Sequence, residues 1–438
     1  MRTMDDSVLM YLALARKKYL FTANPVPVQK KLLLGLVRKS QSTVFGRKYK
    51  FGDIRACREF ITRVPPSAYS EFQPYINAII EGTENVLFPG RPVCFGRTTG
   101  TDGVSKQIPL NRSLLRNSRM SAVDAALLGG LAKGTLRWHS GKTLYIGPRK
   151  GSPLGRSMIY SEGTAFAYLQ SRFMVKRFVP EYQMLPEADE PQDHALLTRL
   201  SFEYKPKILA GHPVEMAHFL GSTQTKFPDV DVVFNCGCWA QDFNPIYQKA
   251  LPNAHVIDVY GTNEGTWGLP VKPGIFLLNF QRVVFTFLPI NEGEPAVMID
   301  DVVPGRKYEM CVTTGGGLWN YRTGDIVMVL SITPALIRLC GRTSRILNIN
   351  GEMVTENEVV LAVKSSSVHS LNYYLTNEHG RYILYTDDAS ADANHIHQEL
   401  CVINKTYGQL RNAGVLPVLK VICSDDSVKK SKKPIRIL

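Results

Sequence analysis

The stretch from Thr98 to Lys106 reads TTGTDGVSK and follows the apolar run Val93-Cys94-Phe95. Its glycines let successive backbone N–H groups turn toward one point, which is how proteins build a nest for an anion. The hydroxyl groups add hydrogen-bond donors, and the lysine adds a mobile positive charge suited to phosphate oxygens. The spacing is not that of a Walker loop, because Gly100 and Gly103 stand only three positions apart. The stretch predicts a phosphate-binding loop, with an ordinary surface turn before a helix as the alternative.

Two later segments carry groups that would complement such a loop. Residues 259–265 read VYGTNEG and place one carboxylate, Glu264, in a polar turn after a β-branched run. Residues 320–327 read NYRTGDIV and place an aromatic ring, a cation and an acid, Asp325, before an apolar strand. Each segment alone is a weak signal, but all three in this order resemble the adenylate-forming enzymes.

In detail the chain resembles the Gretchen Hagen family of acyl-acid amido synthetases, which comprises the auxin-responsive conjugating enzymes and their bacterial relatives. It looks like a bacterial-type member, and the likeness runs nearly end to end. The motifs that carry it are Thr43-Val44-Phe45-Gly46-Arg47, Val64-Pro65-Pro66 with Tyr69, Phe285-Thr286-Phe287-Leu288-Pro289, Tyr321-Arg322-Thr323-Gly324-Asp325, and Gly351-Glu352-Met353-Val354-Thr355-Glu356. The run from Tyr321 to Asp325 is the most specific of them.

The hydrophobic periodicity indicates an α/β protein. Residues 1–90 have mainly helical spacing, and over residues 91–335 β-branched runs alternate with helical stretches. The later strands follow one another without long helices between them, which predicts an antiparallel or barrel-like subdomain. Together with the resemblance, this predicts a large N-terminal adenylate-forming domain over residues 1–336, with mixed sheets, helices and a barrel-like subdomain. A small C-terminal α+β lid domain over residues 337–438 would follow a hinge near residues 337–342.

The resemblance implies a two-step reaction that uses ATP and Mg²⁺. A small carboxylic acid attacks the α-phosphorus of ATP, which gives an acyl-adenylate and pyrophosphate. An amino acid or another amine then attacks the acyl carbon and expels AMP, leaving an amide. Both steps depend on charge neutralisation and alignment more than on acid–base chemistry. A small aromatic or hormone-like acid is the substrate that the family leads us to expect.

The resemblance also implies roles for individual residues. The phosphates would be held by Thr98, Thr99, Gly100, Thr101, Gly103 and Lys106, and the rest of the nucleotide by Tyr260, Gly261, Thr262, Asn263, Asp325 and Arg342. Glu264 would ligate Mg²⁺, which proteins hold with a few carboxylates while substrate phosphates supply further oxygens. Asp325 would accept hydrogen bonds from the ribose hydroxyls. Lys106, Glu264 and Lys433 are therefore the expected catalytic residues.

Each role has a plainer alternative. Glu264 could be an acid at the start of a helix, where it would stabilise the helix dipole. Asp325 could be a turn acid, and Arg342 could be a surface salt-bridge partner. Tyr321 and Arg322 could serve as supports for Asp325.

Three positions depart from the family pattern. Many relatives carry a lysine where this chain has Met353, and that lysine meets the α-phosphate. Asn263 stands where a serine is common, and Thr286 stands where an acid is usual. Lys432 or Lys433, near the end of the chain, could supply the missing charge, or the pair could be a solvated basic tail. These departures motivate a second hypothesis, a degenerate protein that binds nucleotide without turnover; an acyl-CoA ligase, which shares the first half-reaction, is a third.

The acyl pocket is expected beside the helix that follows the phosphate loop. Arg116 and Arg119 lie on that helix and could steer an acidic substrate. On most helices such residues are simply solvated, so a substrate-binding role for them rests on little more than their position.

Composition limits the possible functions. The formal net charge is +14, yet the sequence contains no nucleic-acid motif, and a basic field suits anionic substrates such as nucleotides and carboxylates. The eight cysteines lack the paired spacing of a zinc site and lie mostly in apolar runs, which indicates thiols in a reducing compartment. The sequence contains no secretory signal and no apolar stretch of the ~18 residues that would span a bilayer. We therefore expect a cytoplasmic enzyme that does not insert into a membrane.

Overall fold

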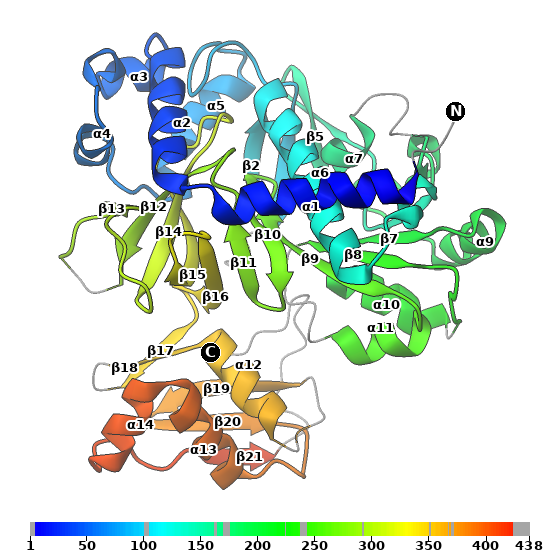
Figure 1. Cartoon of the computed structure of the whole chain (residues 1–438), viewed down its shortest axis with the longest axis vertical. Coiled ribbons are helices and arrows are strands. Elements are labelled where there is room, and N and C mark those ends of the chain that lie inside the picture. The colour runs from blue at the N-terminus through cyan, green and yellow to red at the C-terminus, as the bar shows by residue number, and fades with distance from the viewer. Residues whose placement is uncertain are drawn as a thin grey trace. The chain divides into compact units, whose positions relative to one another are not determined.

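The computed structural model describes residues 5–99, 105–161, 164–169, 176–223, 225–236, 243–290, 293–349, 352–366, 368 and 372–423. The chain divides into two compact units (Figure 1). The first comprises residues 1–306, 311–323 and 329–337, and the second comprises residues 307–310, 324–328 and 338–438.

The described part of the first ninety residues is mainly helical, as the sequence predicts. They form α1 (Asp6–Thr22), α2 (Pro25–Lys39), α3 (Val44–Lys48), the 3₁₀ turn η1 (Phe51–Asp53), α4 (Cys57–Arg63) and α5 (Tyr69–Ile80). Helix α2 begins where Asn24 caps the N–H of Val26 and a proline occupies the first turn, a position that tolerates its missing N–H. Helix α5 buries Phe72, Ile76 and Ile79, which lie on one face at helical spacing.

Helix α1 has no single apolar face. It buries Ala13 and Leu20, but Val8, Tyr11 and Leu12 are exposed on its other side. Because apolar residues surround the whole helix, its placement needs a polar anchor as well. Arg16 supplies one, since its Nε lies 2.7 Å from Oδ1 of the buried Asp124 on α6.

The largest sheet among the described residues has twelve strands. Its strands, in spatial order, are β13 (Val297–Met298), β12 (Val284–Pro289), β14 (Lys307–Thr313), β15 (Tyr321–Ser331), β16 (Leu336–Arg342), β11 (Ile275–Leu278), β10 (Gly265–Lys272), β9 (His255–Thr262), β8 (Val232–Cys236), β7 (Ile208–Gly211), β3 (Thr143–Ile146) and β6 (Phe178–Val179). Strands β6, β3, β7, β8 and β9 run parallel, whereas β9, β10 and β11 pair antiparallel. The pairing of β9 with β10, β10 with β11 and β12 with β13 is antiparallel, as expected for the later strands, and these strands belong to the same sheet as the parallel ones. Residues 337–342, expected as a hinge, lie in strand β16.

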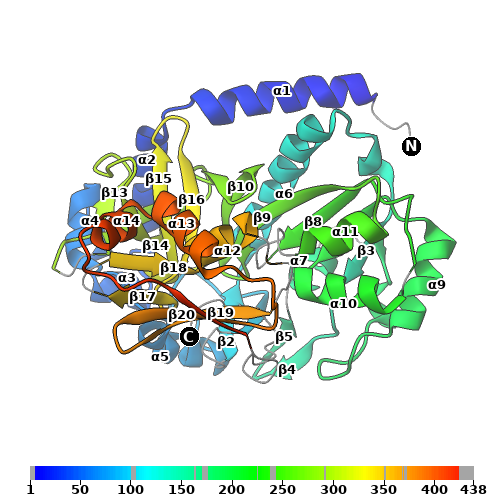
Figure 2. The ribbon, with the colours of Figure 1, turned by 90° about the horizontal axis from the view of Figure 1, so that it is seen from below.

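Helices cover both faces of the parallel half, as the α/β pattern predicts (Figure 2). They are α6 (Arg112–Lys133), α7 (Thr164–Tyr168), α9 (His194–Tyr204), α10 (Pro213–Thr223) and α11 (Asn244–Ala250), with the 3₁₀ turns η2 (Arg137–Ser140) and η3 (Tyr182–Met184). One core cluster joins α9, α10 and α11 to β3, β7 and β8. On the other face α6 packs against β9 and β10, and α1 lies over α6. Gly129 permits this close packing, because a Cβ there would collide with the side chain of Ile257 on β9.

A smaller sheet carries the residues on either side of the phosphate loop. Its spatial order is β2 (Ser105–Leu110), β1 (Cys94–Thr99), β5 (Ser157–Ser161) and β4 (Ser152–Leu154). Strands β1 and β2 pair antiparallel, so the glycine-rich stretch closes a β-hairpin. This corrects the expected order of strand, loop and helix. Helix α6 begins only after β2, because Asn111 caps it by accepting a hydrogen bond from Leu114 N.

The second unit has an α+β core of its own. After the strand ends of β14, β15 and β16 it contains β17 (Ile346–Ile349), β18 (Glu352–Thr355), α12 (Glu356–Ser365), β19 (Tyr373–Glu378), β20 (Arg381–Thr386), α13 (Ala393–Ile403), α14 (Lys405–Asn412) and β21 (Lys420–Cys423). Helices α13 and α14 are separate because Asn404 ends α13 and caps α14 by accepting from Tyr407 N. Leu375, Leu384 and Tyr407 lie in the single core cluster beneath them.

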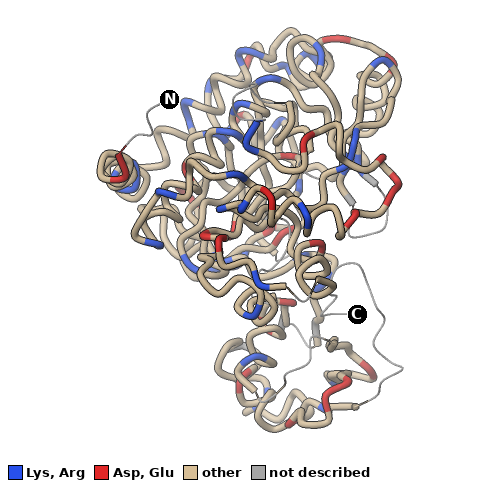
Figure 3. The backbone as a smooth tube through the Cα atoms, turned by 90° about the vertical axis from the view of Figure 1, so that its right-hand side faces the viewer, with Lys and Arg blue, Asp and Glu red and all other residues tan. Residues whose placement is uncertain are grey.

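The surface agrees with the composition. Figure 3 shows lysine and arginine spread along the backbone and interleaved with acids. No helix among the described residues is both long and apolar enough to cross a bilayer. The described cysteines Cys57, Cys94, Cys311, Cys340, Cys401 and Cys423 are free thiols.

Candidate active site

The β1–β2 hairpin holds the two ends of the predicted phosphate loop together. Thr98 on β1 and Lys106 on β2 are register partners, so the hydroxyl residue and the lysine start from adjacent backbone positions. Gly100, Thr101 and Gly103 lie outside the described residues, and of Thr99 the structure describes the backbone alone. The hairpin therefore brings together Thr98 and Lys106 of the predicted phosphate ligands.

Lys106 lies between two tyrosine rings. Its Nζ is 5.5 Å from the ring centroid of Tyr69 and 5.9 Å from that of Tyr321, and it donates a hydrogen bond to the Tyr321 hydroxyl at 3.3 Å. Aromatic faces attract an ammonium group and restrict a side chain that would otherwise be mobile. The rings thus position this lysine on the hairpin, beside the loop.

Tyr321 also reaches the expected metal ligand. Its hydroxyl donates a hydrogen bond to Oε1 of Glu264 at 3.4 Å. One phenol therefore connects the phosphate-loop lysine with the carboxylate, although the three residues are far apart in sequence. The sequence assigned Tyr321 to supporting Asp325, and the structure adds this contact with Glu264.

Glu264 lies in a β-hairpin between β9 and β10, which excludes the helix-dipole alternative. The turn is tight because Gly261 has no side chain: a Cβ there would lie 2.7 Å from Gly265 O. Asn263 fastens this turn to the other hairpin by donating from Nδ2 to Arg97 O at 2.7 Å. Asn263, where the family often has serine, thus holds the Glu264 turn beside Thr98.

Two buried oxygens at this junction lack a partner within the described part of the chain. They are Oε2 of Glu264, whose side chain is only 5 % exposed, and Oγ1 of Thr98. An unpaired buried polar atom costs free energy comparable to a lost hydrogen bond, so such atoms in a native fold require an explanation. A carboxylate oxygen fits a Mg²⁺ ion and a hydroxyl fits a phosphate oxygen. No group of three or more His, Cys, Asp or Glu side chains that could hold a metal ion lies among the described residues.

The other predicted residues of the β9–β10 hairpin differ in exposure. Tyr260 is buried, with its ring 5.2 Å from that of Phe276, whereas Thr262 is exposed. The Thr262 hydroxyl accepts a hydrogen bond from the Glu264 N–H at 3.2 Å. Thr262 therefore stabilises the turn that carries Glu264.

The second unit brings Asp325 and Arg342 together. Nε of Arg342 lies 2.8 Å from Oδ1 of Asp325, and the Asp325 side chain is only 6 % exposed. Arg342 is a salt-bridge partner, as the plainer alternative expects, but the acid that it pairs with is buried. This guanidinium compensates the charge of Asp325.

The remaining predicted residues are more peripheral. Arg116 and Arg119 are exposed on α6. Met353 lies in β18, where its backbone pairs with Asn348, and Lys432 and Lys433 lie outside the described residues.

The sequence missed two groups near these residues. Tyr69 clamps the backbone of Gln107 on β2: it accepts from Gln107 N at 2.8 Å and donates to Gln107 O at 3.1 Å. Burial raises the pKa of Tyr69, so the phenol stays protonated and able to donate. Asp258 is an acid inside the β-branched run of β9, which is the sequence signal that could have identified it. It accepts from Asn235 Nδ2 at 3.2 Å, and burial raises its pKa to about 6.

Models of one protein family match two parts of this chain. Residues 15–204 match the family model described as the GH3 family N-terminal domain, and residues 276–342 match the GH3 family central domain. The probable indole-3-acetic acid-amido synthetase GH3.1 of Arabidopsis thaliana is 22 % identical, over 79 % of this chain and 71 % of that protein. The jasmonoyl–L-amino acid synthetase JAR4 of Nicotiana attenuata is 32 % identical over 35 % of this chain and 29 % of that protein.

Solved structures show the same fold. AtGH3.15 acyl acid amido synthetase in complex with 2,4-DB has a TM-score of 0.71 at 17 % identity and covers 96 % of this chain and 90 % of that chain. A 2-hydroxyisobutyryl-CoA ligase in the postadenylation state has a TM-score of 0.59 at 13 % identity and covers 96 % and 91 %. The two family models together match more than half of the 438 residues, and the chain therefore belongs to the GH3 family.

Proposed function

We propose that this chain is an ATP-dependent acyl-acid amido synthetase. It joins a carboxylic acid to an amine, with an amino acid as the favoured acceptor, through an acyl-adenylate. Membership of the family supports this, as do relatives named for amide synthesis with indole-3-acetic acid or jasmonic acid. The observation that carries the proposal is the junction of the two hairpins, where Lys106, Tyr321 and Glu264 are linked and two buried oxygens lack a partner.

The first step needs positive charge near the phosphates of ATP. Lys106 would neutralise phosphate oxygens, and the Thr98 hydroxyl would donate a hydrogen bond to one of them. Glu264 Oε2 would hold Mg²⁺, which when bound neutralises phosphate charge in the transition state. Tyr321 would keep the lysine and the carboxylate at a constant separation, so that neither has to reorganise during the reaction.

Asp325 and Arg342 would act on the nucleoside. An ionised carboxylate has several acceptor sites, so one oxygen of Asp325 can stay paired with Arg342 while the other accepts from the ribose hydroxyls. Tyr260, Gly261 and Thr262 would contribute to the adenine site, and Gly100, Thr101 and Gly103 to the phosphate loop. We retain the division into an adenylate-forming domain over residues 1–336 and a lid domain over residues 337–438, and we propose a cytoplasmic location, which suits the free thiols.

The test is carboxylate-dependent release of pyrophosphate from ATP and Mg²⁺, with a panel of aromatic and aliphatic acids. Each acid is assayed alone, with mixed amino acids, and with coenzyme A. We expect one acid class to trigger release, and one amino acid to accelerate it while an amide accumulates. Thioester formation with coenzyme A and no amide would replace the proposal with an acyl-CoA ligase. Nucleotide binding without release for any acid would contradict the proposal.

If the chain binds nucleotide without releasing pyrophosphate, a variant at Met353 supplies a second assay. Met353→Lys restores the charge that many relatives have at this position. If the wild-type chain binds ATP without turnover and this variant releases pyrophosphate, the chain is a degenerate family member that lost the reaction at this residue. If the wild-type chain already turns over, another group supplies the charge, and Lys433→Ala tests whether that group is Lys433.

A further inference from the structure

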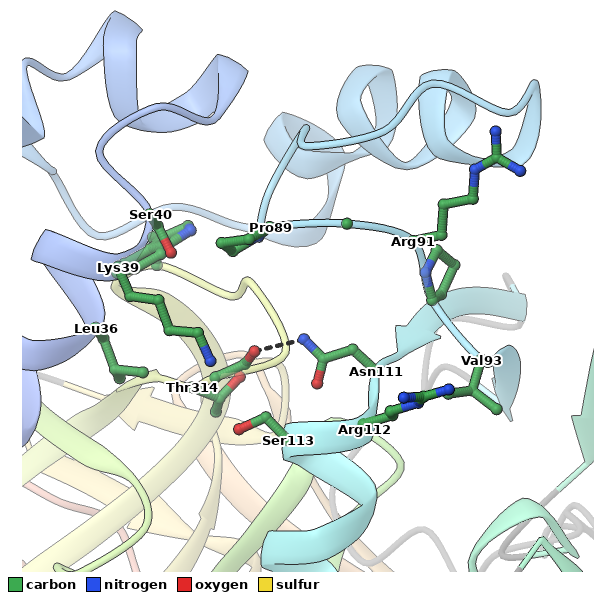
Figure 4. A pocket seen from close by; sticks show the side chains of 14 residues that line it. Leu36, Lys39, Ser40, Pro89, Arg91, Val93, Asn111, Arg112, Ser113 and Thr314 are labelled. Carbon is green, nitrogen blue, oxygen red and sulfur yellow. Dashed lines mark hydrogen bonds between the residues drawn. The ribbon is translucent and has the colours of Figure 1, made fainter.

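A cavity of about 540 Å³ lies in the first unit at the start of helix α6 (Figure 4). It lies between the end of α2, the segment 89–93, the first residues of α6 and the loop at residues 314–315. Strand β2 leads from the phosphate loop at Ser105 to this helix, and its six residues span roughly 20 Å at about 3.3 Å per residue. The cavity is therefore separate from the hairpin junction that carries Lys106 and Glu264.

The charges on the walls are all positive. Lys39, Arg91 and Arg112 line the cavity, and the described lining residues include no carboxylate. Lys39 extends its side chain into the cavity toward the loop of Thr314, whereas Arg91 points away from it (Figure 4). Arg91 is also paired with Glu84 at 2.6 Å. Lys39 and Arg112 are thus the cations available to a ligand.

The start of α6 adds backbone donors. This helix has 22 residues, and the aligned peptide dipoles of a helix this long give its N-terminus a partial positive charge. Asn111 caps Leu114 N and donates from Nδ2 to Gly315 O at 2.6 Å, which ties the helix start to the opposite wall. In the part of the chain that the structure describes, the N–H groups of Arg112 and Ser113 have no protein acceptor. Such N–H groups bind phosphate or carboxylate oxygens in many proteins.

Ser40 adds a hydroxyl to the wall of the cavity. This residue ends α2, is 4 % exposed as a whole and lines the cavity. Its side-chain oxygen has no hydrogen-bond partner among the described protein groups, and Figure 4 shows that oxygen on the cavity side. A hydroxyl that faces an otherwise cationic cavity is suited to donate to an anion.

We propose that this cavity binds a small organic anion with a phosphate or carboxylate head and a compact apolar body. The head would accept hydrogen bonds from Ser40, from the first N–H groups of α6 and from Lys39 and Arg112. The body would contact the apolar part of the wall, which includes Leu36, Pro92 and Trp319. The volume lies within the range of small-molecule sites and exceeds the need of an inorganic ion. This site is independent of the proposed amido synthetase activity.

The experiment is calorimetric titration of the full chain with inorganic phosphate, phenyl phosphate and cyclohexanecarboxylate. All titrations use a Lys106→Ala background, so that binding at the phosphate loop is suppressed. We expect phenyl phosphate or cyclohexanecarboxylate to bind more tightly than inorganic phosphate, and the tighter of the two identifies the head group. Lys39→Gln and Arg112→Gln should each weaken binding about tenfold, as expected for a charged hydrogen-bond partner.

Lys31→Gln, on the same helix as Lys39 but outside the cavity lining, is the matched control and should leave binding unchanged. Ser40→Ala should weaken binding with little change in the melting temperature, because its hydroxyl makes no hydrogen bond to a described protein group. Two results would overturn the proposal: none of the three probes binds, or binding is unaffected by Lys39→Gln and Arg112→Gln together.

Discussion

The hydroxyl of Tyr321 donates a hydrogen bond to Oε1 of Glu264 at 3.4 Å. The hydroxyl oxygen of Tyr321 also accepts a hydrogen bond from Lys106 Nζ at 3.3 Å. One phenol therefore joins the predicted metal ligand to the predicted phosphate ligand. Tyr321 is held on its other side by Phe72 of α5, with the two rings 5.9 Å apart at 76°. The geometry of the proposed catalytic groups therefore depends on an aromatic residue that has no proposed contact with the substrates.

Removing that hydroxyl should weaken catalysis more than stability. In Tyr321→Phe, Lys106 and Glu264 lose their common partner while the ring packing remains. We expect the rate of acid-dependent pyrophosphate release to fall about tenfold, which corresponds to one hydrogen bond to a charged group. Tyr382→Phe removes a buried phenol oxygen from the core of the second unit and serves as the matched control. An equal loss of rate in the two variants would contradict a positioning role for Tyr321.

Neutralising the proposed metal ligand should alter the dependence on Mg²⁺. Glu264→Gln retains the size of the side chain but removes the charge that would attract the cation. We expect pyrophosphate release to fall on the order of 10²- to 10³-fold, as for loss of a main electrostatic contact. The Mg²⁺ concentration for half-maximal rate should rise, while the melting temperature stays the same or increases because a buried charge is removed. An unchanged Mg²⁺ dependence would show that Glu264 is not the ligand.

The buried acid on β9 should make stability depend on pH. Burial raises the pKa of Asp258 from 3.8 to about 6, so between these pH values the folded chain binds a proton that the unfolded chain has released. Stability due to this group is thus highest below pH 4 and is lost as pH rises to 6. Asp258→Asn should be more stable than wild type by roughly 3 kcal/mol at pH 7, at 1.4 kcal/mol per pKa unit. Urea unfolding of both proteins at several pH values measures the difference, which should vanish near pH 4; a constant difference would contradict the pKa shift.

The ion-pair cluster under α1 should contribute strongly to stability. Asp124 on α6 is only 3 % exposed and pairs with Arg16 and Arg282, each at 2.7 Å. Asp124→Asn would leave two guanidinium groups without their counter-charge, and we expect a loss of about 2–4 kcal/mol. Asp231, which is a third exposed and pairs with lysines at 3.7 Å, is the control; Asp231→Asn should cost less than about 1 kcal/mol. Similar losses in the two variants would mean that the cluster contributes little.

Local sequence predicted most of the elements. Helix α6 has a capping asparagine, a regular apolar spacing and a glycine at its end, so its bounds follow from the chain alone. The strands of the parallel half are short β-branched runs. Both faces of such strands are buried, so they can be predicted from their apolar sequence. Strand β2 was not predicted, since SKQIPL contains a proline and becomes a strand only by pairing with β1.

For the candidate site, the sequence predicted the functional residues but not their hydrogen-bond and ion-pair partners. The sequence by itself determined that the chain contains a glycine-rich loop with a lysine, a carboxylate in a turn, and an acid after an aromatic residue, because these are local patterns. Only the tertiary structure decided that Tyr321 connects Lys106 to Glu264 and that Arg342 pairs with Asp325. It also decided that Tyr69 of α5, which lies 37 positions before Lys106 in the sequence, hydrogen-bonds to the backbone of Gln107 on β2. The physical reason is that hydrophobic spacing specifies which face of an element is buried, whereas the pairing of polar groups across distant segments depends on how those buried faces pack together.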